Sequence, residues 1–238
     1  AKDFPRSEFA IVDTVVNQPN VESIVFREQD GSYVVGVLAA MASKAGKLGF
    51  VGGMDIPLIR RFACGYVQGA RSVRADIEIF ENMTGTTGAA WSDPVKGSEL
   101  ARAQIARGAD VILQAAGGTG IGVLRAAAEA GVLGIGTDSN QNGLHPGKVL
   151  TSMLKRVDSA VLRTYAASRN GAWKGGVTAL GLKEDGIAWA LDDNNRALIT
   201  PGMKDAADRA VAGIVSGRIQ VHDFTSDGKC PIAASPGG

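Results

Sequence analysis

The sequence predicts an α/β protein with parallel sheets flanked by helices. Short apolar runs alternate with segments of helical period, single glycines stand where helices should stop, and 45% of the residues are hydrophobic. Strands that alternate with helices form parallel sheets through right-handed crossovers. The length of 238 residues corresponds to between one and two domains.

Six apolar runs are predicted to be strands, and they occupy residues 9–12, 22–28, 47–51, 76–80, 111–114 and 132–136. A helix of small residues is expected over 32–43. Over 58–74, apolar residues recur every three or four positions with arginines between them, which is typical of an amphipathic helix.

The ends of the later helices carry recognisable signals. Asp93 followed by Pro94 predicts the start of a helix that runs to Arg107, since Asp caps helices and Pro suits their first position. Gly108 and Gly131 stand where two helices are expected to end.

Composition excludes several classes of function. The sequence has 25 Lys and Arg against 24 Asp and Glu, and aromatic residues make up 5%, so no nucleic-acid partner is expected. No run of 18 uncharged apolar residues predicts a membrane span, and no signal peptide is expected within the printed sequence. Cys64 lies in an apolar stretch and Cys230 in the tail, and with two His they predict neither a zinc site nor a disulfide framework. No metal or cofactor is expected.

Carboxylates, amides and glycines follow the predicted strands. Ligands of open parallel sheets bind just beyond the carboxyl ends of the strands. Acidic side chains and bare glycine backbone there suit a small polar ligand whose hydroxyls or ring nitrogens need acceptors. The candidate binding residues from this pattern are Asp13, Met54, Asp55, Gly117, Gly118, Thr119 and Asp138.

The same edge leaves an enzymatic alternative open. Residues 118–122 (GTGIG) resemble a dinucleotide-binding turn, but Val123 stands where that motif requires glycine, so a tight strand-to-helix turn is favoured. Ser152 and Lys155 match S-x-x-K without the companion S-D-N and K-T-G strings, and Lys155 reads as a surface lysine. Carboxylates among hydroxyl-binding groups more often accept hydrogen bonds than transfer protons, so no catalytic residue is assigned.

A resemblance to a known family rests on segments in a fixed order. They are FAIVD (9–13), KLGFVGGMDIPLIRRFACGYVQGA (47–70), WSDPVKGSELA (91–101), GADVILQAAGGTGIGV (108–123), GTDSNQN (136–142), VLTSMLKRVD (149–158) and GLKEDGIAWALDDNN (181–195). From about residue 4 to about residue 223, the chain resembles the basic membrane protein family of bacterial ABC-transporter substrate-binding lipoproteins, which includes purine nucleoside receptors.

The resemblance implies a type I periplasmic-binding-protein-like fold with a ligand held between two lobes. It implies a carboxy-terminal ligand-binding lobe at 46–150, and a partial amino-terminal lobe with crossovers and tail at 1–45 and 151–238. Crossings between the lobes are expected near Ala45-Gly46 and between Asn140 and Thr151. The match starts only after the first ~100 residues of the family pattern, so the amino-terminal lobe is expected to be incomplete and its open sheet edge to favour self-association.

The resemblance also implies which residues touch the ligand. They are Asp13, Gly117, Gly118, Asp138 and Lys155. In nucleoside-binding members Asp138 corresponds to an acceptor of ribose hydroxyls. Purine-binding relatives place a stacking aromatic at the position of Leu113, so one of the two faces that would enclose a purine is expected to be aliphatic or missing here.

The function expected on this basis is a non-enzymatic solute-binding protein for a purine nucleoside or nucleobase-like molecule. Its expected partners are that small molecule and an ABC permease, at the periplasmic or lipid-anchored face of a bacterial cell envelope. Two alternatives stay open: a nucleoside-processing or dinucleotide-dependent enzyme that uses the carboxylate-lined edge, and a fragment without solute affinity.

Overall fold

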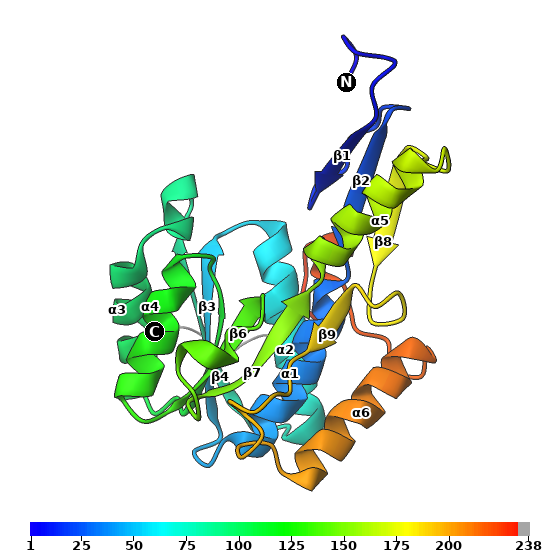
Figure 1. Ribbon diagram of the computed structural model, residues 1–238. Helices are drawn as coiled ribbons and strands as arrows, with labels where there is room; N and C mark the ends of the chain where they lie inside the picture. Colours follow the sequence, from blue (N-terminus) through cyan, green and yellow to red (C-terminus); the bar gives the residue numbers. More distant parts are fainter. Residues whose placement is uncertain (233–238) are drawn as a thin grey trace.

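Two sheets organise the chain, whose computed structural model describes residues 1–232 (Figure 1). The smaller sheet has the parallel order β1-β2-β8, from β1 (Phe9–Val12), β2 (Val21–Phe26) and β8 (Gly176–Leu180). The larger sheet has the order β4-β3-β5-β6-β7-β9, from β3 (Lys47–Met54), β4 (Glu78–Gly85), β5 (Val111–Ala115), β6 (Leu133–Asp138), β7 (Val149–Lys155) and β9 (Ile187–Trp189). β9 pairs antiparallel with β7, and the other described pairings of this sheet are parallel.

Helices cover both faces of the larger sheet. Phe50 on β3 packs into a core with α1 and α2, whereas its neighbour Val51 packs into a second core with α3 and α4. Strands buried on both faces carry continuous apolar runs, which is how β3 and β5 appear in the sequence. The helices are α1 (Glu28–Ala42), α2 (Pro57–Val73), α3 (Pro94–Ala106), α4 (Thr119–Glu129), α5 (Val157–Arg169), α6 (Pro201–Val215) and α7 (Phe224–Asp227), with 3-10 turns η1 (Gly88–Trp91) and η2 (Asn142–Leu144).

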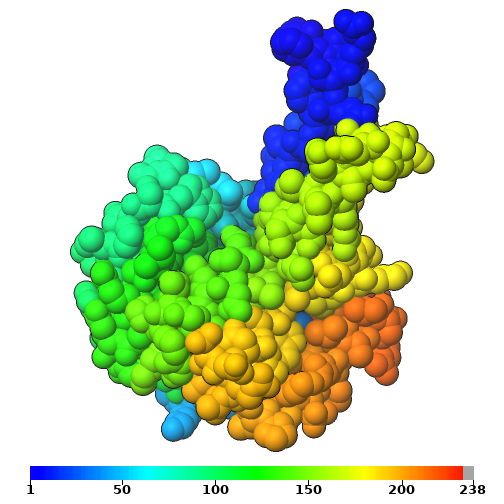
Figure 2. Space-filling view, in the orientation of Figure 1, coloured from blue at the N-terminus to red at the C-terminus, as the bar shows by residue number. Residues whose placement is uncertain are grey.

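The smaller sheet and α5 project from the rest of the molecule, as Figure 2 shows. Glu22 on β2 joins them, because its carboxylate accepts hydrogen bonds from Thr164 of α5 at 2.8 Å and Thr178 of β8 at 3.0 Å. Among the described residues, no helix has the length and apolar character needed to cross a bilayer.

The chain passes between the two sheets at three places. Arg27 links β2 to α1, Arg156 links β7 to α5, and residues 181–186 link β8 to β9. The loops at 45–46 and 140–151, where crossings are expected from the sequence, instead join elements of the larger sheet and its helices. The difference arises because α1 packs against α2 and β7, and because β7 extends the larger sheet.

The prediction of parallel sheets flanked by helices is confirmed, and so are several boundaries. The Asp93 side chain caps α3 by accepting from the Lys96 amide at 2.9 Å. Gly108 and Gly131 end helices with φ of 99° and 73°, where a side chain would be strained. Strands β7, β8 and β9 were not predicted from the residues, because the sequence signal there is short and mixed.

α1 and α2 approach so closely that glycine is required between them. A Cβ at Gly69 would collide with the Tyr33 carbonyl oxygen, and one at Gly36 would collide with the carbonyl oxygen of Tyr66. We expect Gly69→Ala to lower the free energy of unfolding by about 2–3 kcal/mol, because backbone atoms cannot move aside as a flexible side chain would. Urea denaturation measures this change.

Gly202→Ala is the matched control, since Gly202 also lies in a helix but has no atom within 4 Å of a Cβ built on it. That substitution should be neutral or slightly stabilising. Equal losses of stability at positions 69 and 202 would contradict the close helix contact.

The two cysteines form a disulfide, so the expectation of no disulfide framework was wrong. Cys64 on α2 is bonded to Cys230, 166 residues later, with their Cα atoms 5.6 Å apart. The tail returns over α2 because Arg61 and Gln68 of that helix bind its residues 222–225. Such long-range contacts leave no local signal in the sequence.

The predicted self-association stays a prediction, and the outer face of α5 gives it a physical basis. Leu162 and Tyr165 are 67% and 59% exposed there, and β1 and β8 each pair along one side only within the described residues. We expect the sedimentation coefficient to rise with protein concentration, and Leu162→Glu to weaken the rise. A coefficient that stays at the monomer value at high concentration would refute this.

Candidate ligand-binding site

A cavity of about 190 Å³ lies where the two sheets meet. Strands β5, β6 and β7 of the larger sheet end at this cavity, and Asp13 reaches it from the end of β1 in the smaller sheet. The lining residues are Asp13, Leu58, Ile59, Phe62, Trp91, Ala115, Gly117, Thr137, Asp138 and Lys155.

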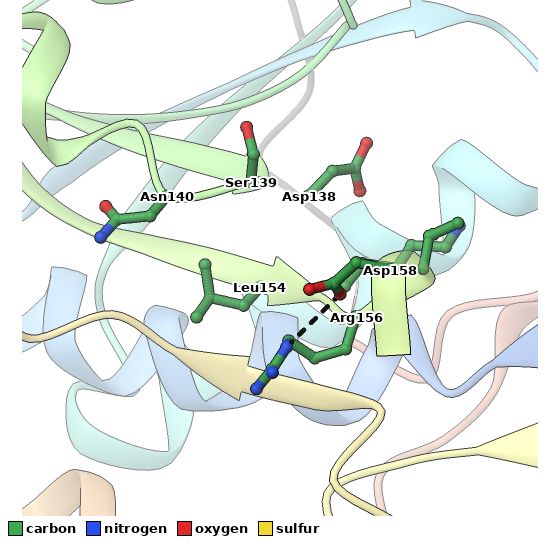
Figure 3. A pocket seen from close by; sticks show the side chains of 8 residues that line it. Asp138, Ser139, Asn140, Leu154, Arg156 and Asp158 are labelled. Carbon is green, nitrogen blue, oxygen red and sulfur yellow. Dashed lines mark ion pairs between the residues drawn. The ribbon is translucent and has the colours of Figure 1, made fainter. Parts of the chain in front are cut away.

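A second hollow of about 460 Å³ adjoins the first, because both are lined by Asp138 and Lys155. Figure 3 shows Asp138, Ser139 and Asn140 along one rim and Leu154, Arg156 and Asp158 along the other. The dashed line in Figure 3 marks the ion pair of Arg156 with Asp158 at 3.6 Å. Together the two hollows form a cleft within the size range of small-molecule sites, about 300–1,000 Å³.

Three residues of the cavity hold left-handed backbone conformations. Asp13 has φ of 65°, Gly117 has φ of 56° and Asp138 has φ of 70°. Glycine adopts this region freely and Asp tolerates it, but such residues concentrate where a structure fixes a functional geometry. Each one lies at the end of a strand or within two residues after it, and each lines the cavity.

Lys155, at the end of β7 in the larger sheet, forms an ion pair with Asp13, which follows β1 of the smaller sheet. Its Nζ lies 2.5 Å from Oδ1 of Asp13 and 3.0 Å from Oε1 of Glu28, and its side chain is 5% exposed. Burial disfavours the charged ammonium, but Glu28 and Asp13 outweigh that effect and raise the pKa of Lys155. The lysine therefore stays protonated and presents a fixed positive charge to the cavity.

Asp138 is the carboxylate without a fixed partner. It accepts no hydrogen bond and forms no ion pair with any residue that the structure describes, although its charge interacts with that of Lys155. Enclosure by the cleft raises the pKa of Asp138, Lys155 opposes that rise, and Asp13 and Glu28 add to it. One face of the carboxylate remains open to the cleft, so it can accept hydrogen bonds from a ligand.

Another part of the lining, the apolar wall, consists of aromatic and aliphatic side chains. The Trp91 ring lies against the backbone of Gly53 and Gly117, since a Cβ at Gly53 would collide with the ring and one at Gly117 would lie 3.6 Å from its Cε3. Ile59 and Phe62, one turn apart on α2, extend this wall. The cavity is thus lined by aromatic and aliphatic side chains as well as by Asp13, Asp138 and Lys155.

Four of the predicted site residues line the cavity, and they are Asp13, Gly117, Asp138 and Lys155. Lys155 is buried, so its interpretation as a surface lysine was wrong. Trp91 and Phe62 were not predicted as site residues. The available signal for Phe62 was the apolar face of its helix, from which Ile59 and Phe62 line the cavity.

Five predicted residues do not line the cavity. Leu113 is fully buried in the core, and Ala115 is the β5 residue that lines the cavity, so Leu113 is corrected from a site residue to a core residue. The Thr119 hydroxyl donates to the Ala90 carbonyl and accepts from the Asp93 amide, both at 2.8 Å, and holds loops together. The other three are Met54, Gly118 and Asp55, whose carboxylate is bound by Arg60 at 2.7 and 2.8 Å.

The motifs that favoured enzymes have structural roles. A Cβ at Gly120 would collide with the Gln114 side chain, and one at Gly122 would collide with the Pro94 carbonyl, so these glycines let α4 pack closely. The Ser152 hydroxyl is buried and donates to Asn142 at 2.9 Å, and it lies three residues from Lys155 on the same strand, hence on the opposite face. Among the described residues, no group of three His, Cys, Asp or Glu side chains is arranged to hold a metal ion.

Comparison with known proteins adds a family to this geometry. A family model described as "ABC transporter substrate-binding protein PnrA-like" matches residues 1–223. The chain belongs to this family. The resemblance seen in the sequence is therefore confirmed, and the PnrA-like family consists of substrate-binding proteins rather than enzymes.

Relatives of the PnrA-like chain include the ABC transporter nucleoside-binding protein BmpA of Lactococcus lactis, which is 35% identical over an alignment of 240 positions that covers 93% of this chain and 66% of BmpA. Basic membrane protein D of Borreliella burgdorferi is 37% identical over an alignment of 194 positions that covers 78% of this chain and 56% of that protein. The chain thus spans two thirds or less of these curated relatives.

A crystal structure of an ABC transporter solute-binding protein from Aeropyrum pernix matches with a TM-score of 0.83 and 27% identity, over 93% of this chain and 72% of that one. The predicted α/β fold of the periplasmic-binding-protein kind is confirmed by this match.

Proposed function

We propose that this PnrA-like chain is the solute-binding component of an ABC transporter and holds a purine nucleoside or a similar nucleobase-containing molecule in the cleft. The observation that carries the proposal is the pairing of two unlike walls in one cavity. Trp91 offers a surface for a flat ring, and the open carboxylate of Asp138 offers an acceptor for hydroxyl groups. A nucleoside combines these two chemical parts.

The names of relatives support this choice of ligand. BmpA, which shares 35% identity with this chain, is named a nucleoside-binding protein. The sequence resemblance independently relates Asp138 to an acceptor of ribose hydroxyls.

The connections between the sheets suit a cleft that opens and closes. Three short linking segments connect the part of the molecule around the smaller sheet with the part around the larger sheet, at Arg27, Arg156 and residues 181–186. The Lys155–Asp13 ion pair at 2.5 Å spans the cleft and favours the closed arrangement. A ligand held by both walls would shift the equilibrium further toward closure, which is the state that a permease can recognise.

The proposed location is the bacterial cell envelope, with a membrane permease as partner. Disulfides persist in oxidising compartments outside the cytoplasm, and the Cys64–Cys230 bond suits such a location. The resemblance to substrate-binding lipoproteins supports the same place.

Isothermal titration calorimetry with inosine, hypoxanthine and ribose tests the proposed function. We expect one site that binds inosine more tightly than either of its parts, because each part reaches only one wall. Chromatography of the recovered inosine should show it unchanged. Absence of binding by all three compounds would contradict the proposal, and conversion of inosine to hypoxanthine and ribose would favour the enzymatic alternative.

A further inference from the structure

A line of ion pairs leads from the ligand cleft to the carboxyl-terminal tail. Lys155 lies between Asp13 at 2.5 Å and Glu28 at 3.0 Å, and the second oxygen of Glu28 lies 2.8 Å from Nη1 of Arg61. Arg61 in turn donates a hydrogen bond to each carboxylate oxygen of Asp223 in the tail, both at 2.9 Å. Five side chains of alternating charge therefore connect the cavity with a segment outside it.

The middle of this line is buried, which makes each member depend on its neighbours. The Glu28 side chain is fully buried, and Arg61 is 14% exposed. Arg61 also donates to the Phe26 carbonyl at 2.8 Å, next to the Arg27 crossing. A buried charge that loses one partner is costly, so a change at Arg61 alters how firmly Glu28 holds Lys155.

The tail is fastened to α2 by further contacts around Asp223. The Gln68 side chain donates to the His222 carbonyl at 3.1 Å and accepts from its amide at 2.9 Å. The Cys64–Cys230 disulfide fixes the tail covalently to the same helix. α2 is also the helix that supplies Ile59 and Phe62 to the cavity wall.

We propose that the disulfide-fastened tail is a positioning element of the ligand site. Asp223 orients Arg61, Arg61 orients Glu28, and Glu28 holds the Lys155 ammonium against Asp13. Glu28, Arg61 and Asp223 are thus positioning residues that do not touch the ligand. A dithiol reductant, itself oxidised to a disulfide as Cys64 and Cys230 become two thiols, loosens the tail and weakens ligand binding, so the oxidised protein is the high-affinity form. The ligand part of this inference rests on the proposed function, whereas the link from tail to Lys155 does not.

The test uses Asp223→Asn and the double variant Cys64→Ser/Cys230→Ser in the full chain. Two matched controls alter neighbouring ion pairs outside the line. Arg60→Ala removes a neighbouring arginine of α2 that binds Asp55 and Glu81. Asp227→Asn removes a tail carboxylate that binds His222. Asp223→Glu keeps the charge and serves as the conservative rescue. Far-ultraviolet circular dichroism and thermal unfolding establish that each variant is folded.

Two readouts separate the inference from the proposed function. The first is the Lys155 Cε signal in carbon–proton correlation spectra of the isotope-labelled chain, identified by its loss in Lys155→Arg, and it needs no ligand. The second is the inosine dissociation constant from calorimetry. We expect Asp223→Asn and the double cysteine variant to shift the Lys155 signal and weaken inosine binding about five- to tenfold, at the lower end of typical coupling between sites. The controls should change neither quantity, and Asp223→Glu should restore part of both.

An unmoved Lys155 signal in the folded test variants would overturn the inference, and so would equal shifts in the controls. A shifted signal with unchanged inosine affinity would overturn the role of the tail in binding. If no form of the protein bound inosine while the signal shifted only in the test variants, the link from tail to Lys155 would be supported and the proposed nucleoside function would fail.

Discussion

Replacing Lys155 by Met is expected to lower the free energy of unfolding by about 3 kcal/mol. The substitution keeps the length of the side chain but leaves Glu28 fully buried without one of its two cationic partners. Removal of one partner from a buried ion pair costs about 3–5 kcal/mol, and the lower end applies because Arg61 still binds the second oxygen of Glu28. Urea denaturation followed by circular dichroism measures the loss.

Lys204→Met is the control for the Lys155 substitution. Lys204 lies 2.6 Å from Asp208, but both side chains are 52% exposed, and such solvent-screened surface pairs contribute little to stability. If Lys155→Met and Lys204→Met destabilised the protein equally, the buried network around Glu28 would not have the energetic role assigned to it.

Asp138→Asn is expected to weaken inosine binding about ten- to hundredfold. The amide keeps the shape of the side chain but loses the charge, and hydrogen bonds to a charged group contribute about 1.5–3 kcal/mol. Hypoxanthine, which has no ribose, should lose much less affinity. Calorimetric titration of both ligands against both proteins provides the comparison, and equal losses for inosine and hypoxanthine would remove the ribose role.

The pH dependence of binding should also identify Asp138. Enclosure in the cleft raises the pKa of its carboxyl group, with Lys155 acting in the opposite direction. Protonation removes the negative charge, so inosine affinity should fall as the pH falls through that raised pKa, which lies above the ordinary Asp value. The Asp138→Asn variant should lack this fall, because Asn does not titrate. An identical pH profile in the two proteins would assign the titration to another group.

The sequence was sufficient to predict the part of the site that depends on sheet topology. Asp13, Gly117 and Asp138 follow apolar strands, and parallel strands bring their carboxyl ends together. Leu113 was predicted to lie in the site because it stands four residues before Gly117, where purine-binding relatives have a stacking aromatic. Leu113 points to the same face of β5 as Ala115 but lies two residues further from the end of the strand, where it is buried in the core.

Features built from distant parts of the chain could not be predicted from the residues. Trp91 reaches the cavity from the turn η1, not from a strand end, and Lys155 appeared exposed because its partners Asp13 and Glu28 are far from it in sequence. The Cys64–Cys230 bond depends on the return of the tail over α2, which no local pattern records. Local sequence fixes strands and caps, whereas burial of charge depends on the completed fold.

A crystal structure of the protein with bound inosine tests the central claim most directly, because it locates the ligand. We expect the purine ring to lie against Trp91 and the two ribose hydroxyls to lie within hydrogen-bond distance of the Asp138 carboxylate, with Lys155 still bound to Asp13. Inosine bound outside this cleft, or bound with its ribose away from Asp138, would contradict the account.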